Sequence, residues 1–170
     1  VPDSGVPAAI GYAQYTKKDF ELGLIRNHYV GRTFIEPTQH IRSLGVKLKL
    51  SSTKTLLKNK KIILIDDSLV RGTTCLKIIK MLYEAGAKEV HVRIACPEII
   101  FPDFYGVDMP TKSELLANGK SISEMCSYIG ANSLSFLSLD GLYNALGKGV
   151  RNKTYPQFSD HYFTGDYPIK

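Results

Sequence analysis

Residues 61–67, with the sequence KIILIDD, constrain the fold more than any other segment, because four aliphatic residues lead directly into two carboxylates. A short, unbroken and largely β-branched apolar run is typical of a strand buried in a parallel sheet. Residues 73–85 have helical periodicity, and residues 90–96 form a second apolar run. Apolar residues recur along the predicted helix at Leu76, Ile79, Leu82 and Tyr83. Strand, helix and strand in succession form a right-handed βαβ unit, so the sequence predicts an α/β fold.

The remaining segments fit a single domain, as expected for 170 residues. Residues 5–17 are rich in alanine and predict a helix that Asp3 or Ser4 would cap. We further predict helices at 113–116, 121–129 and 139–146, a strand at 134–137, and an extended surface tail at 148–170. The predicted division is one domain over residues 1–147 followed by that tail.

Charge and cysteine content limit the classes of partner. The formal net charge is +6, which favours an anionic ligand. Lysine and arginine dominate a segment of residues 26–50 that Gly31, Pro37 and Gly45 interrupt, and we predict a basic loop there. Three scattered cysteines favour neither a disulfide framework nor a zinc site and indicate a reducing, cytoplasmic setting. No apolar run approaches the ~20 residues that span a bilayer, so we expect no membrane partner.

The segment from Asp66 to Thr74 carries the chemistry. Ligands of open α/β sheets bind beyond the carboxyl ends of the strands, where the two aspartates stand. Gly72, Thr73 and Thr74 then open the next helix with unpaired backbone N–H groups and two hydroxyls, which favour a phosphate group. Carboxylates beside a phosphate site predict a phosphorylated sugar as the ligand. Neither the Walker A spacing nor the dinucleotide fingerprint is present.

This segment resembles the phosphoribosyl pyrophosphate signature of type I phosphoribosyltransferases, and much of the chain resembles the transferase half of the amidophosphoribosyltransferase family. The matching stretches are 1–5 (VPDSG), 29–37 (YVGRTFIEP), 66–74 (DDSLVRGTT), 84–90 (EAGAKEV), 104–110 (FYGVDMP) and 129–134 (IGANSL). The resemblance implies the type I phosphoribosyltransferase fold, with a central parallel sheet, flanking helices, a mobile lid over about 26–50 and a small C-terminal hood.

The resemblance also implies roles for individual residues. Phosphoribosyl pyrophosphate would contact Asp3, Ser4, Gly5, Asp66, Asp67, Ser68, Val70, Arg71, Gly72, Thr73 and Thr74. Magnesium would be held by Ser4, Asp66 and Asp67, and the lid would reach the substrate through Tyr29, Arg32 and Lys49. No residue is assigned as a nucleophile or a base. The cysteines that bind an iron–sulfur cluster in some members match Asp103, Phe158 and His161 here, which argues against a cluster.

The implied reaction is displacement of pyrophosphate from phosphoribosyl pyrophosphate by ammonia, giving 5-phosphoribosylamine in the first step of purine synthesis. The family implies magnesium as the cofactor, feedback by purine nucleotides, and a homo-oligomer for the full-length enzyme. In the family, ammonia comes from an N-terminal glutaminase domain, which no part of this chain matches. We therefore expect an excised or processed piece, with its first core strand truncated before Val1, and a fragment unstable without its missing part.

Two other readings stay open. A purine or pyrimidine salvage transferase would keep the phosphoribosyl site but would need a base-recognition hood, whereas residues 105–117 and 129–137 resemble the amidotransferase instead. A regulator would keep the site to sense phosphoribosyl pyrophosphate or nucleotides, or to bind nucleic acid, without turnover. DNA binding is disfavoured because the basic residues fall in a predicted loop and not on a helix.

Overall fold

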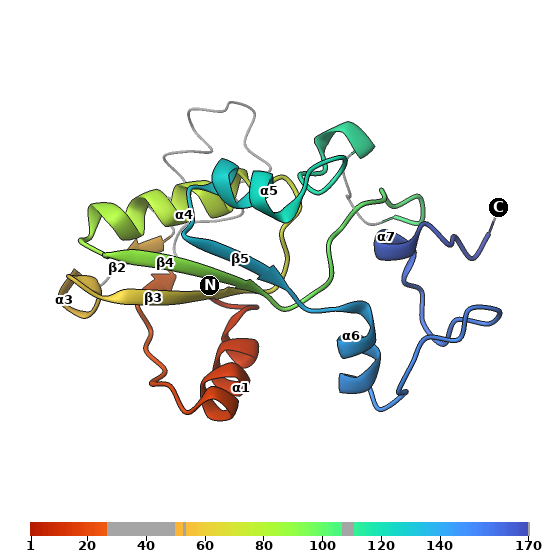
Figure 1. Cartoon of the computed structure of the whole chain (residues 1–170), viewed down its shortest axis with the longest axis horizontal. Helices are drawn as coiled ribbons and strands as arrows, with labels where there is room; N and C mark the ends of the chain where they lie inside the picture. Colours follow the sequence, from red (N-terminus) through yellow and green to blue (C-terminus); the bar gives the residue numbers. More distant parts are fainter. Residues whose placement is uncertain (27–49, 53, 107–110, 170) are drawn as a thin grey trace.

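The computed structural model describes residues 1–26, 50–52, 54–106 and 111–169. Its central element is a parallel sheet of three strands, β3 (Lys61–Asp66), β4 (Glu89–Ile94) and β5 (Ser133–Phe136), in the order β3-β4-β5. All three strands run in the same direction, so their carboxyl ends meet at one edge (Figure 1). The predicted parallel α/β fold is confirmed, and β3 forms an edge of this sheet among the described residues.

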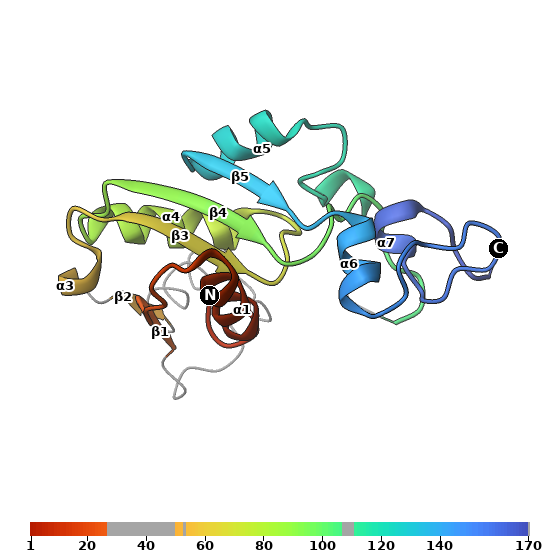
Figure 2. The same cartoon turned by 60° about the horizontal axis from the view of Figure 1, so that its bottom comes forward.

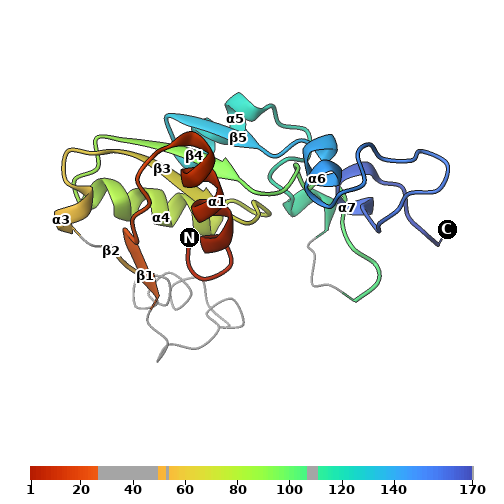
Figure 3. The same ribbon diagram turned by 90° about the horizontal axis from the view of Figure 1, so that it is seen from below.

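Helices cover both faces of the sheet. Helices α4 (Thr73–Glu84) and α5 (Ile122–Ile129) lie on one face, and α1 (Val6–Thr16) lies on the other, against β3 (Figure 3). The α4 side chains that are buried in the core are Cys75, Ile78, Ile79 and Leu82. The predicted stripe is confirmed at Ile79 and Leu82 and was wrong at the other two positions: Leu76 is half-buried and Tyr83 is exposed, because the sheet beneath selects the helix face.

The start of α1 also differs from the sequence prediction. Its N-cap is Gly5, and neither Asp3 nor Ser4 caps the helix with a side chain. Gly5 is buried, whereas Asp3 and Ser4 are exposed. The turn before α1 therefore leaves these two polar side chains available to solvent.

Helix α5 begins with a complete capping box. The Ser121 hydroxyl accepts a hydrogen bond from the Glu124 backbone N–H at 3.3 Å, and the Glu124 carboxylate accepts one from the Ser121 N–H at 2.7 Å. We expect Ser121→Ala to lower the free energy of unfolding by about 1 kcal/mol, because the Glu124 N–H loses its acceptor. Chemical denaturation would measure the change. Ser123→Ala, on the same helix without the cap, serves as the control, and an equal effect of both would contradict this interpretation.

Two short strands stand at the ends of the predicted lid. Strand β1 (Leu24–Arg26) pairs antiparallel with β2 (Leu50–Ser52), with Leu24 opposite Ser52. The sequence did not predict these strands. Residues 27–49 between them lie outside the described residues, and so do the predicted lid residues Tyr29, Arg32 and Lys49.

The remaining helices are short. Helix α3 (Lys54–Leu57) precedes β3. The C-terminal third contains the 3-10 helix η2 (Lys112–Glu114), α6 (Leu139–Ala145) and α7 (His161–Thr164). The tail extends beyond α6 at the end of the molecule opposite α3 (Figure 2). The tail was predicted to be a surface segment, but Asp160 and His161 are buried. Asp160 accepts hydrogen bonds from Arg151 and Tyr143, and His161 is hydrogen-bonded to Asp103. No helix of the described part of the chain has the length and apolar character needed to cross a membrane.

Candidate functional site

The two predicted carboxylates stand where β3 ends. Asp66 is its last residue and is 8% exposed, whereas Asp67 is exposed. The Asp67 backbone N–H donates to Asp66 Oδ1 at 3.0 Å, and the Ser68 N–H donates to Asp67 Oδ1 at 2.9 Å. The strand therefore turns at once, which places both acids at the carboxyl edge of the sheet although they are adjacent in sequence.

The two acids differ in their electrostatic setting. Burial raises the pKa of Asp66 to about 7, with a further upward contribution from the neighbouring Asp67. The Val1 amino group acts in the opposite direction, and its own pKa is lowered by burial. A carboxyl group that resists ionisation in the free protein gains most from a cationic ligand, because that ligand stabilises its charged form.

The turn of residues 3–5 packs against the same strand end. Gly5 donates to the Val1 carbonyl at 3.0 Å, and the Val1 amino group donates to the Ile65 carbonyl. A Cβ atom on Gly5 would lie 2.8 Å from the Val1 oxygen and 3.0 Å from the Ile65 oxygen, so only glycine permits this approach. The structure therefore brings this turn beside Asp66, 61 positions away in sequence. The Pro2–Asp3 peptide bond is cis.

Asp3 connects this turn to the base of the predicted lid. Its carboxylate forms an ion pair with Arg26, the last residue of β1. The Nε atom of Arg26 is buried and has no hydrogen-bond partner among the described residues. Arg26 was not singled out by the sequence, where it is one of many cations in a basic segment.

The predicted phosphate loop, residues 68–74, joins β3 to α4. Gly72 has a φ of 76°, and a Cβ atom there would lie 2.6 Å from Leu116 Cδ2 and 3.1 Å from the Tyr128 ring. Thr73 and Thr74 are exposed in the first turn of α4, which contains no acidic residue and has no side-chain cap. An uncapped helix start with exposed hydroxyls suits a phosphate group.

The sequence did not predict the residues that support this loop. The Leu116 backbone N–H donates to the Val70 carbonyl at 2.8 Å, and Glu114 forms an ion pair with Arg71 at 3.4 Å. Tyr128 of α5 lies beside Gly72. The apolar run of residues 115–117 could have indicated a buried segment, but its contact with a loop more than 40 positions earlier is a tertiary feature.

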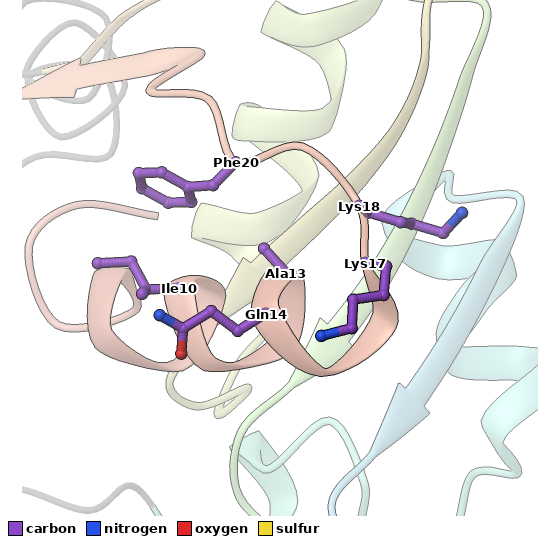
Figure 4. Close-up of a pocket in the computed structure, with 6 residues that line it drawn as sticks. All are labelled: Ile10, Ala13, Gln14, Lys17, Lys18 and Phe20. Atoms are coloured by element: carbon purple, nitrogen blue, oxygen red, sulfur yellow. The ribbon is translucent and has the colours of Figure 1, made fainter.

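The described residues also form two hollows, one along α1 and one along β3. A shallow hollow of about 390 Å³ lies along the C-terminal half of α1 and is lined by the residues labelled in Figure 4: Ile10, Ala13, Gln14, Lys17, Lys18 and Phe20. A larger hollow of about 760 Å³ extends along β3 between α1 and residues 55–57. The first is at the far end of α1 from Gly5, so we do not assign the predicted ligand to it.

Metal binding by the site would need few protein ligands. Within the described ranges, no group of three or more His, Cys, Asp or Glu side chains could hold a metal ion. Magnesium, however, uses one or two carboxylates together with water and phosphate oxygens. The adjacent carboxylates of Asp66 and Asp67 therefore fit magnesium that arrives with a phosphorylated ligand.

Asp103, Phe158 and His161 match the positions of the cysteines that bind an iron–sulfur cluster in some family members, and all three make other contacts here. His161 Nε2 and Asp103 Oδ1 are 2.8 Å apart, and both side chains are buried. The Phe158 ring packs against Tyr143 with 5.6 Å between centroids. Cys75, Cys96 and Cys126 are free thiols.

The fold and the site define an α/β domain that presents paired carboxylates, a glycine turn and an open helix N-terminus at one sheet edge, as a binder of phosphorylated sugars does. No protein-family model matches the chain. An amidophosphoribosyltransferase of Rhizobium etli is 60% identical over all of this chain, which covers 34% of that protein. The chloroplastic amidophosphoribosyltransferase 1 of Arabidopsis thaliana is 54% identical over the whole chain, which covers 29% of it.

A solved structure agrees with these relatives. The glutamine phosphoribosylpyrophosphate amidotransferase of B. subtilis, in complex with ADP and GMP, matches 98% of this chain at 48% identity with a TM-score of 0.84. This chain covers 36% of that structure. Over its whole length the chain is therefore similar to one region of the amidophosphoribosyltransferases, and it spans about a third of the length of the relatives it matches.

Proposed function

We propose that this chain binds phosphoribosyl pyrophosphate and transfers its phosphoribosyl group to ammonia with release of pyrophosphate. The observation that supports this most directly is the close approach of Gly5 to the Ile65 carbonyl, one residue before Asp66. This approach supports the proposal because it brings residues 3–5, which would bind the pyrophosphate, beside the carboxylates that would hold the ribose. The matched relatives are enzymes of this name, and their printed names extend to this chain only as part of the proposal.

Each part of the ligand has a proposed binding group. The 5-phosphate would accept hydrogen bonds from the phosphate loop at the start of α4, through Ser68, Gly72, Thr73 and Thr74 with Val70 and Arg71. The ribose hydroxyls would bind Asp66 and Asp67. The pyrophosphate would bind the turn of Asp3, Ser4 and Gly5, and Tyr29, Arg32 and Lys49 of the lid would add their groups on closure.

Magnesium would be held by Asp66, Asp67 and Ser4 together with ligand oxygens, and when bound it offsets charge on the leaving pyrophosphate. The chain itself supplies orientation and exclusion of water. The loop and the turn would hold the phosphate and pyrophosphate ends apart, which aligns the anomeric carbon with incoming ammonia. The C–N bond then forms as the C–O bond to pyrophosphate breaks, and the ammonium proton leaves to solvent.

The wider setting is also proposed. Ammonia would come from a glutaminase domain like that with which the family begins, and residues 1–147 would form the transferase domain with 148–170 as its tail. The B. subtilis structure contains ADP and GMP, which supports purine nucleotides as feedback ligands. We propose a homo-oligomeric enzyme in a reducing compartment such as the cytoplasm, consistent with three free thiols, although the plant relatives are chloroplastic.

The test is release of pyrophosphate from phosphoribosyl pyrophosphate, with and without magnesium and ammonium, at mildly alkaline pH. We expect release that requires both additions, because the charged leaving group needs a cation and ammonia is the nucleophile. Release without ammonium would indicate hydrolysis. Binding of phosphoribosyl pyrophosphate without any release would reject the transferase and favour the sensing regulator.

A further inference from the structure

A segment distant in sequence supports the phosphate loop from outside the site. The Leu116 N–H donates to the Val70 carbonyl at 2.8 Å, and the Leu116 side chain packs against Gly72. Two positions earlier, the Glu114 carboxylate contacts Arg71 Nε at 3.4 Å. The same short segment therefore holds both the backbone and a side chain of the loop.

Glu114 is itself held in place. Its backbone N–H donates to the Thr111 carbonyl at 2.9 Å, and its Oε2 accepts from the Thr111 hydroxyl at 3.2 Å. The two residues that follow, Leu115 and Leu116, are 1% and 4% exposed, so the backbone that carries Glu114 is anchored in the core. The carboxylate is thus presented to Arg71 from a fixed support.

The ion pair can contribute little to stability. The Arg71 and Glu114 side chains are 46% and 51% exposed, and exposed pairs are weak because water screens them. The ion pair can nevertheless fix the orientation of the Arg71 guanidinium. A guanidinium can contact one carboxylate through Nε while its terminal nitrogens bind another anion in a fixed plane.

We infer that Glu114 is a positioning residue, which orients the Arg71 guanidinium toward the phosphate of the ligand at the phosphate loop. The inference rests on the proposed function, which makes residues 68–74 a phosphate site. Glu114 does not touch the ligand. It acts through Arg71, because the ion pair holds the guanidinium in the binding orientation before the ligand binds.

The experiment compares Glu114→Gln, Arg71→Ala and the double variant. The dissociation constant of ribose 5-phosphate is measured by calorimetry, and KM and kcat come from ammonium-dependent pyrophosphate release. We expect Glu114→Gln to raise the dissociation constant and KM by roughly 3- to 10-fold, with kcat within about twofold, because part of an arginine–phosphate bond is lost. The thermal midpoint should not change. In the Arg71→Ala background, Glu114→Gln should have no further effect.

Glu89→Gln is the control, because Glu89 at the start of β4 pairs with Lys61 at 2.8 Å and with His91 at 3.1 Å, at the end of the sheet opposite the phosphate loop. An unchanged dissociation constant in Glu114→Gln would overturn the inference. An equal loss with and without Arg71 would overturn it too, since Glu114 would then act on the fold in general. If the unaltered protein releases no pyrophosphate, the proposed function fails, whereas binding of ribose 5-phosphate still decides the role of Glu114.

Discussion

Replacing Asp66 by asparagine is expected to make the protein more stable and much less active at the same time. Asp66 is 8% exposed, and burial raises its pKa to about 7, so its ionised form is costly in the folded state without a ligand. Asparagine keeps an oxygen that can accept the Asp67 N–H bond now seen at 3.0 Å. We expect the free energy of unfolding at pH 8 to rise by roughly 2–4 kcal/mol.

The pH dependence follows from the direction of the pKa shift. Because the folded pKa lies above the unfolded value, the folded state binds a proton more tightly than the unfolded state between about pH 4 and pH 7. The contribution of Asp66 to stability is complete below this range and is lost as the pH rises through it. The difference between the variant and the unaltered protein should therefore grow from pH 4 to pH 7 and stay constant above. Urea denaturation across this range, without magnesium, measures it.

Asp67→Asn is the matched control. Asp67 is adjacent but exposed, so its replacement should raise stability much less than that of Asp66, because it removes only the upward contribution of Asp67 to the pKa of Asp66. Both variants should lose pyrophosphate release by about 100-fold, since each removes a carboxylate proposed to bind the ribose and magnesium. Equal stability of Asp66→Asn and the unaltered protein at pH 8 would show that burial of Asp66 carries no such cost. Full activity with unchanged magnesium dependence in Asp67→Asn would contradict the proposal that the two carboxylates bind the ribose and magnesium.

The same strand end shows what a sequence can reveal. The run of residues 61–67 predicted both a buried parallel strand and carboxylates at its carboxyl end, because both properties follow from neighbouring residues. The helix after Gly72 was likewise predicted from local periodicity. Its buried face was predicted only in part: Ile79 and Leu82 are buried as expected, but Leu76 and Ile78 are both apolar, and only the sheet beneath determines that Ile78 is the one covered.

The supports of the site could not be predicted in this way. The contact of Leu116 with Gly72 and the pair between Glu114 and Arg71 join segments more than 40 positions apart. No periodicity or spacing records such contacts. The resemblance to a family predicted that the turn of residues 3–5 belongs to the site, whereas its packing against the Ile65 carbonyl is visible only in three dimensions.

In the C-terminal tail, composition alone did not predict which residue is buried. Its glycine, proline and asparagine residues indicated a surface segment, and most of residues 148–159 are exposed. Asp160 is nevertheless 3% exposed, because its carboxylate finds enough donors to replace water. A charged residue in a polar stretch does not reveal whether such donors will surround it.

Asp160→Asn is expected to cause the largest loss of stability. Its Oδ2 accepts from the Tyr143 hydroxyl at 2.7 Å and from Arg151 Nε, and its Oδ1 accepts from Arg151 Nη2 and the Thr164 hydroxyl, both at 3.1 Å. An amide group would turn NH₂ toward some of these donors and leave the Arg151 charge, 13% exposed, without its buried partner. We expect a loss of about 3 kcal/mol, as for other broken buried pairs.

The effect also depends on pH in a defined direction. Burial by itself would raise the pKa of Asp160, but the bonds from Arg151 and Tyr143 outweigh it and hold this pKa below its ordinary value. The contribution to stability is therefore present above the unfolded pKa and is lost as the pH falls through the lower, folded one. The destabilisation by Asp160→Asn should be complete at pH 7 and should shrink as the solution is acidified below about pH 4.

Asp166→Asn separates the buried partner of Arg151 from the exposed one. Asp166 contacts the same guanidinium at 2.8 Å but is 47% exposed, so its replacement should cost less than about 1 kcal/mol. The measurement is urea denaturation together with hydrogen exchange of the Ile100 and Phe101 amides, which donate to the Tyr162 carbonyl at 2.9 and 3.0 Å. If Asp160 fastens the tail to the loop after β4, both amides should exchange faster in Asp160→Asn alone. Equal exchange in both variants would mean that the tail is held by its other contacts, with the buried His161 and Asp103 pair foremost among them.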